Sequence, residues 1–175
     1  EFFKTMNEYG LRPLLGVELY LGLKSSGFEP RERDQAHLIA VARTDRGLRN
    51  LWCLTNATSD AKHFRNVGRV FWEDIEKYHE GITFTSACCL GLGPQGIVNG
   101  DYQHANRYLD ILGDNFVIEV SSYPSESKFR DQDSDDGFDP RLYNEALVSW
   151  AQERGIRVIY GDDAHYAKPS QAEFH

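Results

Sequence analysis

Short apolar runs rich in β-branched and aromatic residues alternate along this chain with stretches of helical periodicity. Runs of this strand-like kind occupy positions 14–21, 36–42, 81–86, 116–120 and 157–160. Strands that alternate with helices are typical of crossover connections between neighbouring strands of one sheet. The alternation therefore predicts an α/β fold built around a parallel sheet.

The helical stretches carry apolar side chains three and four residues apart, as on one face of a helix. They cover positions 45–59, 72–78 and 101–112. A further helix is predicted to begin at Asp139 and Pro140, which suit an N-cap and a first-turn position. The glycine-rich segment 91–100 is predicted to be irregular or weakly helical, and 126–136 to be an acidic loop.

Length, composition, net charge and cysteine count limit the classes of protein to which this chain can belong. With 175 residues, 41% of them apolar, the chain can form one domain with a real core. No apolar run is long enough to span a membrane, and a net charge of -8 argues against a generic basic nucleic-acid binder. That charge still allows a site that holds phosphate through bound cations. An odd number of cysteines implies no disulfide framework, so we expect a reducing cytoplasm.

The start of the chain carries no signal peptide and no initiator methionine. We therefore expect the sequence to be a piece of something longer.

The strongest candidate for a functional segment follows the last strand-like run. Asp163 and His165 lie two residues apart, so in extended backbone their side chains leave the same face. Carboxylate and imidazole together suit zinc, manganese or iron. The alternative is an ordinary polar loop after a strand.

Earlier in the chain, three other residues also have the chemistry of metal ligands. Glu18 interrupts an apolar strand, His37 begins the next one, and Cys88 follows a third, close to Gly91. An ionised carboxylate among apolar residues is costly unless it is paired or bound to metal. Each also has an ordinary interpretation: a solvent-facing glutamate, a hydrogen-bonded histidine and a buried thiol.

The position of these residues along the strands matters, because parallel sheets collect their sites at the C-terminal strand ends. Cys88, Asp163 and His165 satisfy this rule by sequence, whereas Glu18 and His37 fit it less well. The sequence contains no glycine-rich phosphate loop of Walker or Rossmann type and no G-x-S-x-G elbow.

Several segments in register resemble the PHP (polymerase and histidinol phosphatase) domain, in the version found in bacterial-type DNA polymerase III alpha subunits. The resembling stretches are GLRPLLGVELY at 10–20, HLIAVA at 37–42, GLRNL at 47–51, EGI at 80–82 with SAC at 86–88, and GDDAHY at 161–166. Their order and spacing match that family over almost the whole chain. Gly161 and Asp162 depart from the family pattern, in which Thr and Asn are usual.

The resemblance implies a seven-stranded, distorted β/α barrel of PHP type with up to three divalent metal ions, zinc or manganese. Transferred by position, the metal ligands are Glu18, His37, Cys88, Asp163 and His165. An early His-x-His of the family would lie upstream of residue 1. We therefore expect residues 1–175 to form a single PHP-type domain that is N-terminally incomplete, with its first strand or strands missing.

The resemblance also implies a function in DNA replication. The parent polymerase adds deoxynucleotides, while this domain supports the polymerase core and, when loaded with metal, removes mismatched 3′ nucleotides. Asp163 and His165 would then be catalytic, and the partners would be the DNA primer 3′ end and the remaining polymerase domains, with no membrane. One alternative is a free-standing metal-dependent PHP phosphoesterase that acts on a small phosphate ester. The other is a non-enzymatic scaffold that retains the ligands.

Overall fold

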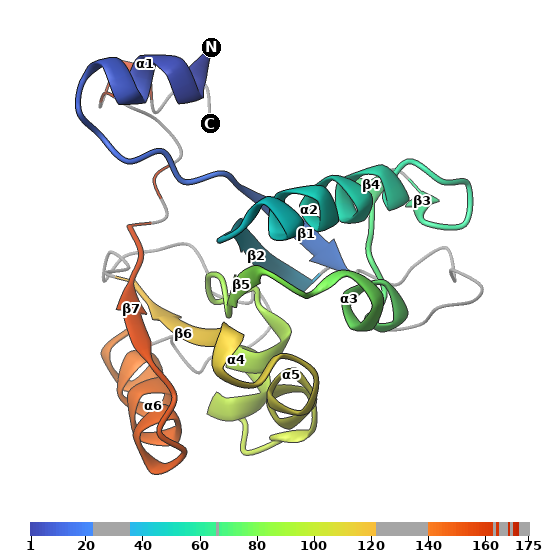
Figure 1. The fold of residues 1–175 in the computed structure, drawn as a ribbon. Coiled ribbons are helices and arrows are strands. Elements are labelled where there is room, and N and C mark those ends of the chain that lie inside the picture. The colour runs from blue at the N-terminus through green and yellow to red at the C-terminus, as the bar shows by residue number, and fades with distance from the viewer. Residues whose placement is uncertain are drawn as a thin grey trace.

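The computed structural model describes residues 1–22, 36–65, 67–121, 140–162, 164, 168 and 170–171. Its helices are α1 (Phe2–Glu8), α2 (Asp45–Ala57), α3 (Trp72–Tyr78), α4 (Leu92–Val98), α5 (Gln103–Leu112), the 3-10 turn η1 (Gly113–Asn115) and α6 (Pro140–Glu153). Its strands are β1 (Gly16–Leu21), β2 (Ala36–Ala42), β3 (Phe64–Arg65), β4 (Val67–Gly68), β5 (Ile82–Thr85), β6 (Phe116–Val120) and β7 (Val158–Tyr160). Figure 1 shows helices and strands mixed along the chain, which confirms the α/β class.

The main sheet has the strand order β1-β2-β5-β6-β7. Strand β2 runs antiparallel to both β1 and β5, whereas β5, β6 and β7 are parallel to one another. The prediction of a parallel sheet is therefore confirmed for β5, β6 and β7 and wrong for β2. Between β1 and β2 the sequence carries no helical stripe, whereas a parallel neighbour needs a crossover connection that is usually a helix.

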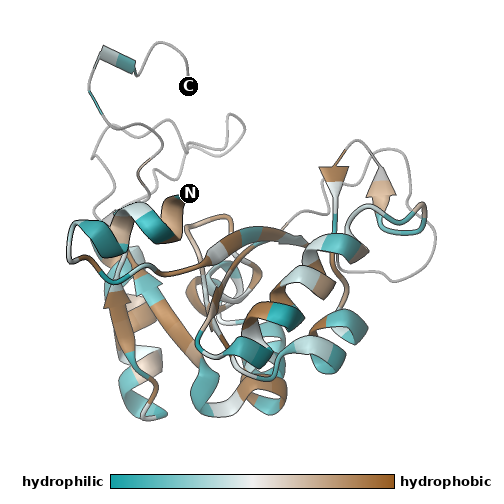
Figure 2. Ribbon diagram, turned by 45° about the horizontal axis from the view of Figure 1, so that its top comes forward, coloured by the Kyte–Doolittle hydropathy of each residue, from teal (hydrophilic) through white to brown (hydrophobic). Residues whose placement is uncertain are grey.

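The strand register separates two faces of this sheet. Leu19 pairs with Leu38, Ala40 with Phe84, and Phe84 with Phe116, so these side chains share one face. All of them are buried in a single apolar cluster that also takes in residues of α2, α3, α4, α5 and α6. Figures 1 and 2 show these helices against strands that are largely hydrophobic. The helices thus cover one face, which we call the helix face.

The opposite face, here the site face, carries the other set of alternating side chains. Its members are Glu18, Tyr20, His37, Ile39, Val41, Thr83, Thr85, Val117, Glu119 and Ile159. Because β2 runs antiparallel to β5, the start of β2 lies at the same edge of the sheet as the ends of β5, β6 and β7. The reversal of β2 therefore brings His37 to the edge where a parallel sheet would place its functional residues.

Helix α2 begins with an N-cap residue, Thr44, and with a glycine, Gly47, that lets the helix approach the backbone before β5 closely. The Thr44 side chain accepts a hydrogen bond from the Gly47 N–H at 3.0 Å, and Asp45 lies in the first turn. A Cβ atom built on Gly47 would collide with the backbone carbonyl of Gly81. The absence of a side chain at Gly47 lets α2 pack directly on the turn that starts β5.

Other sequence predictions had mixed outcomes. Residues within 91–100, predicted to be irregular or weakly helical, contain the regular helix α4. His63 lies in the polar segment after α2, yet its Nε2 is 2.9 Å from Asp74 Oδ2 and its side chain is only 18% exposed. No helix in the described part of the chain is long and apolar enough to cross a membrane. The seven-stranded barrel stays a prediction, because the described residues give a five-stranded mixed sheet and a small hairpin.

Candidate metal centre

Glu18 and His37 meet on the site face across the β1–β2 ladder. The Nδ1 atom of His37 lies 2.6 Å from Oε1 of Glu18, and the two side chains are 20% and 47% exposed. Since a carboxylate only accepts hydrogen bonds, Nδ1 carries the proton in this arrangement. The ring of Tyr20 packs edge-on against the imidazole, with 5.2 Å between centroids. His37 is therefore held in one orientation at the start of β2.

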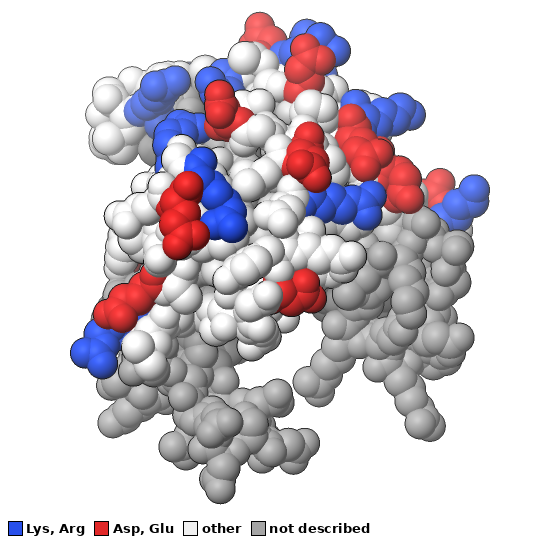
Figure 3. All heavy atoms as spheres, turned by 90° about the horizontal axis from the view of Figure 1, so that it is seen from below, with Lys and Arg blue, Asp and Glu red and all other residues white. Residues whose placement is uncertain are grey.

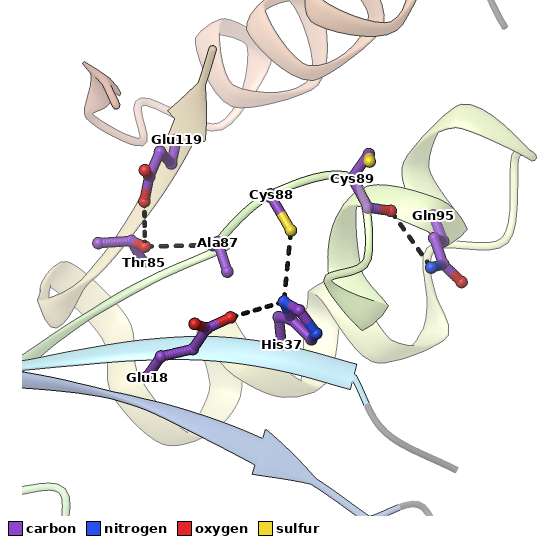
Figure 4. A network of polar contacts seen from close by, with 8 residues as sticks. All are labelled: Glu18, His37, Thr85, Ala87, Cys88, Cys89, Gln95 and Glu119. Carbon is purple, nitrogen blue, oxygen red and sulfur yellow. Dashed lines mark hydrogen bonds and ion pairs between the residues drawn. The ribbon is translucent and has the colours of Figure 1, made fainter. Parts of the chain in front are cut away.

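Cys88 reaches the same nitrogen from the turn after β5. Its Sγ lies 3.4 Å from His37 Nδ1, and the residue is 8% exposed. The turn depends on Ala87, whose φ of 57° lies in the left-handed region and makes it the one non-glycine residue of the described chain with positive φ. Figure 4 shows the glutamate, the imidazole and the thiol converging from three segments of the fold.

The surroundings of Cys88 favour its ionised form. Hydrogen bonding to the Cys89 side chain lowers the pKa of the Cys88 thiol to about 5, with further help from His37 and the Leu90 backbone, and against the effect of burial. A thiolate is the form of cysteine that binds metal. Cys88 therefore has the protonation state that a metal ligand needs at neutral pH.

The three donors fit a divalent transition metal by their chemistry. Carboxylate oxygen, imidazole nitrogen and thiolate sulfur are the ligand types that zinc and other borderline ions accept. Within the described residues, however, no group of three His, Cys, Asp or Glu side chains is arranged to enclose an ion. Glu18, His37 and Cys88 form hydrogen bonds through one shared nitrogen instead.

The other two predicted ligands, Asp163 and His165, lie outside the described residues. Strand β7, which leads into them, runs parallel to β6 and ends at Tyr160. Of the following segment, Gly161 donates its N–H to the carbonyl of Val120 at 2.9 Å, and Asp162 is exposed. The prediction that Asp163 and His165 are metal ligands and catalytic residues stays untested.

Sequence reasoning placed Glu119 inside a strand without giving it a role. The structure buries it at the end of β6, where its Oε2 accepts a hydrogen bond of 2.5 Å from the Thr85 hydroxyl. A Cβ atom built on Gly161 would collide with the other carboxylate oxygen of Glu119. A carboxylate within an apolar strand was the available signal, the same one that singled out Glu18.

Charged side chains of both signs lie on the surface of the protein. Figure 3 shows lysine and arginine side chains interspersed with aspartate and glutamate over one face, without a large region of a single sign. On the site face, a cavity of about 510 Å³ is lined by Thr85, Val117 and Ile159 together with the arginines Arg12, Arg43 and Arg157. These basic side chains thus lie where β2 ends and β7 begins, at the edge of the sheet opposite His37 and Cys88.

Comparison with known proteins places these features in a family. A model of the PHP domain matches residues 1–123. DNA polymerase III subunit alpha of Borreliella burgdorferi is 30% identical over 98% of this chain and 14% of that protein. The Aquifex aeolicus and Chlamydia trachomatis proteins of the same name are each 26% identical, over 100% and 97% of the chain and 15% of each relative.

The chain thus spans about one seventh of the length of these relatives. The family model covers Glu18, His37 and Cys88 but ends before Asp163. With most of its residues matched by that model, this chain belongs to the PHP domain family.

Proposed function

We propose that this chain is the PHP portion of a replicative DNA polymerase alpha subunit, and that its site hydrolyses phosphodiester bonds with bound divalent metal ions. The substrate would be the mismatched 3′ end of a DNA primer. The observation that carries the proposal is the convergence of Glu18 and Cys88 on one nitrogen of His37. The names of the relatives support the polymerase context, and PHP domains are generally metal-dependent.

The residues present fit zinc or manganese, and Glu18, His37 and Cys88 would hold the ion together with Asp163 and His165. Bound divalent ions supply a Lewis acid and positive charge for phosphoryl oxygens. The chain itself would fix the orientation of the donors: Tyr20 packs on the imidazole, and burial shields the Cys88 sulfur. Arg12, Arg43 and Arg157 line a cavity towards the opposite edge of the sheet, and their positive charge would attract DNA phosphates to that part of the site face.

The deciding experiment compares two activities of the full-length protein. Asp163→Asn is nearly isosteric but removes one negative charge from a site that must hold cations. We expect metal-dependent removal of a mismatched 3′ nucleotide to be abolished, while primer extension stays close to wild type. The matched control is Asp110→Asn, on the exposed side of α5, which should change neither activity.

Three outcomes would redirect the proposal. Wild-type hydrolysis by Asp163→Asn would show that the end of β7 is not the metal site. A parallel loss of hydrolysis, extension and thermal stability would favour a purely structural role in support of the polymerase core. Hydrolysis of a small phosphate ester by the wild type, with no action on primer ends, would favour a free-standing phosphoesterase.

A further inference from the structure

Glu119 is linked to Ala87, the residue before Cys88, by a continuous chain of buried hydrogen bonds. The Thr85 hydroxyl donates to Glu119 Oε2 at 2.5 Å, and the same oxygen of Thr85 accepts the Ala87 N–H at 3.1 Å. Ala87 directly precedes Cys88. Figure 4 shows this chain beside the Glu18–His37–Cys88 contacts, with Ala87 and Cys88 joining the two groups.

The direction of these hydrogen bonds follows from the chemistry of the groups. A threonine hydroxyl has one proton, and the carboxylate of Glu119 can only accept it. The lone pairs of the Thr85 oxygen are then left to accept the N–H of Ala87. Glu119 therefore fixes the rotation of the hydroxyl so that Thr85 serves as an acceptor for the turn.

That turn needs support, because Ala87 adopts a backbone conformation that residues with a side chain rarely occupy. Ser86 adds two further hydrogen bonds between the turn and β6. Its Oγ accepts the Glu119 N–H at 2.9 Å, and its own N–H donates to the Val117 carbonyl at 3.1 Å. Both the backbone and the side chain of Glu119 thus hold the residues that present Cys88.

We propose that Glu119 is a positioning residue of the candidate metal centre, which acts through Thr85 and Ala87 to aim the Cys88 sulfur at His37. It does not itself bind the metal. Its second carboxylate oxygen lies where a Cβ atom of Gly161 would be, so the same side chain also packs against the strand end that leads to Asp163. The inference rests on the proposed metal site, but the geometry of the turn can be tested without metal.

The first test measures hydrogen–deuterium exchange in the metal-free full-length protein, read by mass spectrometry over residues 86–90. Thr85→Val keeps the shape and removes the hydroxyl, and Glu119→Leu keeps the bulk and removes the acceptor. Both should accelerate exchange of the Ala87 amide at least about tenfold, while amides of helix α2 stay unchanged. Unchanged exchange at Ala87 in both variants would overturn the proposal.

The second test measures zinc affinity by competition with a chromophoric chelator. Changes to residues that orient a ligand lower metal affinity by about 10–100-fold, and we expect this of Thr85→Val and Glu119→Leu. Glu119→Gln retains a carbonyl that accepts the Thr85 proton, so it should stay within a few fold of wild type. Equal losses in Glu119→Gln and Glu119→Leu, with normal exchange at Ala87, would make Glu119 a direct ligand and overturn the proposal.

A second substitution that restores zinc affinity can distinguish a loss of Cys88 positioning from a general loss of stability. Ala87→Gly removes the steric cost of the left-handed turn, so in the Thr85→Val background it should recover much of the lost zinc affinity. Glu76→Gln, an exposed change on α3, serves as the matched control and should affect nothing. If Ala87→Gly restores no affinity, and the losses only follow the melting temperature, the proposal fails. If even the wild type binds no zinc, the proposed function fails, while exchange at Ala87 still decides the role of Glu119.

Discussion

His37 contacts Glu18 diagonally across the β1–β2 ladder, with 2.6 Å between Nδ1 and Oε1, although neither residue is the direct pairing partner of the other. His37 pairs with Tyr20, and Glu18 pairs with Ile39. Side chains at such diagonal positions share a face and come within reach when they are long. The contact exists because β2 runs antiparallel to β1, which sets the start of β2 beside the end of β1 and brings His37 within diagonal reach of Glu18.

Removal of the imidazole should therefore have the largest effect on metal binding. His37→Ala deletes the nitrogen that Glu18 and Cys88 share, and we expect zinc and manganese to bind at least about tenfold more weakly. Elemental analysis of the complete domain should show two or three ions per chain in the wild type and fewer in the variant. His104→Ala, in which a histidine stacked on Trp72 is lost, is the control. Wild-type affinity in His37→Ala would remove this residue from the ligand set.

Gly161→Ala should disturb Glu119, because the new methyl group would occupy the place of a carboxylate oxygen. Overpacking of this kind typically costs about 1–3 kcal/mol of the free energy of unfolding. The measurement is a double-mutant cycle with Glu119→Ala, which makes room for the methyl group. We expect the two changes together to cost less than their sum, and strict additivity would contradict the close approach of Gly161 to Glu119.

Gly47→Ala should destabilise the protein although alanine is the better helix former. The helical preference favours alanine by about 1 kcal/mol, but the added methyl group would meet the Gly81 carbonyl in the backbone. Backbone atoms cannot move aside as a flexible side chain can, so we expect a net loss of about 1–3 kcal/mol. Gly93→Ala in α4, where the methyl group meets the Tyr108 ring at 3.4 Å and Ala105 Cα at 3.8 Å, should be neutral or stabilising. Chemical denaturation of both variants gives the comparison.

Tyr108 should make the protein less stable at alkaline pH. Burial raises the pKa of its phenol above the usual range, and its hydroxyl has no hydrogen-bond partner among the described residues. Above about pH 10 the unfolded chain loses this proton while the folded protein keeps it. The unfolded state then binds fewer protons, so the free energy of unfolding falls as pH rises, by up to about 1.4 kcal/mol per unit.

Tyr108→Phe should remove that part of the alkaline loss and leave stability near neutral pH unchanged or higher. Urea unfolding midpoints at about pH 8 and about pH 11 provide the test. Tyr102→Phe, at a residue that is 41% exposed, should keep the wild-type dependence. An identical pH dependence in Tyr108→Phe and the wild type would contradict the burial of an ionisable phenol at this position.

Local sequence pattern predicted the helices and strands well where apolar residues recur with a clear period and where glycine, proline or a capping residue marks the ends. The bounds of β6 and α3 agree with those predicted, and β2 covers the predicted run. Pattern also identified Glu18, His37 and Cys88 as unusual, since each has ligand chemistry at a position within or beside an apolar strand. These signals are local: they depend on side-chain type and on spacing along a few residues.

The relative direction of the strands depended on tertiary structure. Periodicity reports which side of a strand is buried, but it carries no information about which neighbour the backbone hydrogen bonds join. The antiparallel placement of β2 comes from those non-local bonds, and it moves His37 to the edge where β5 and β6 end. The sequence alone therefore left His37 and Glu18 as poor fits to a site that the fold assembles around them.

The left-handed turn at Ala87 and the pairing of Glu119 with Thr85 were likewise beyond sequence reasoning. Alanine seldom adopts positive φ, so no local signal predicts it, and a hydrogen bond between residues 34 positions apart requires two strands already in register. The sequence by itself determined which residue types are available for a metal centre. The packing of β5 between β2 and β6 decided which of them meet, because only that arrangement sets their side chains on one face at one edge of the sheet.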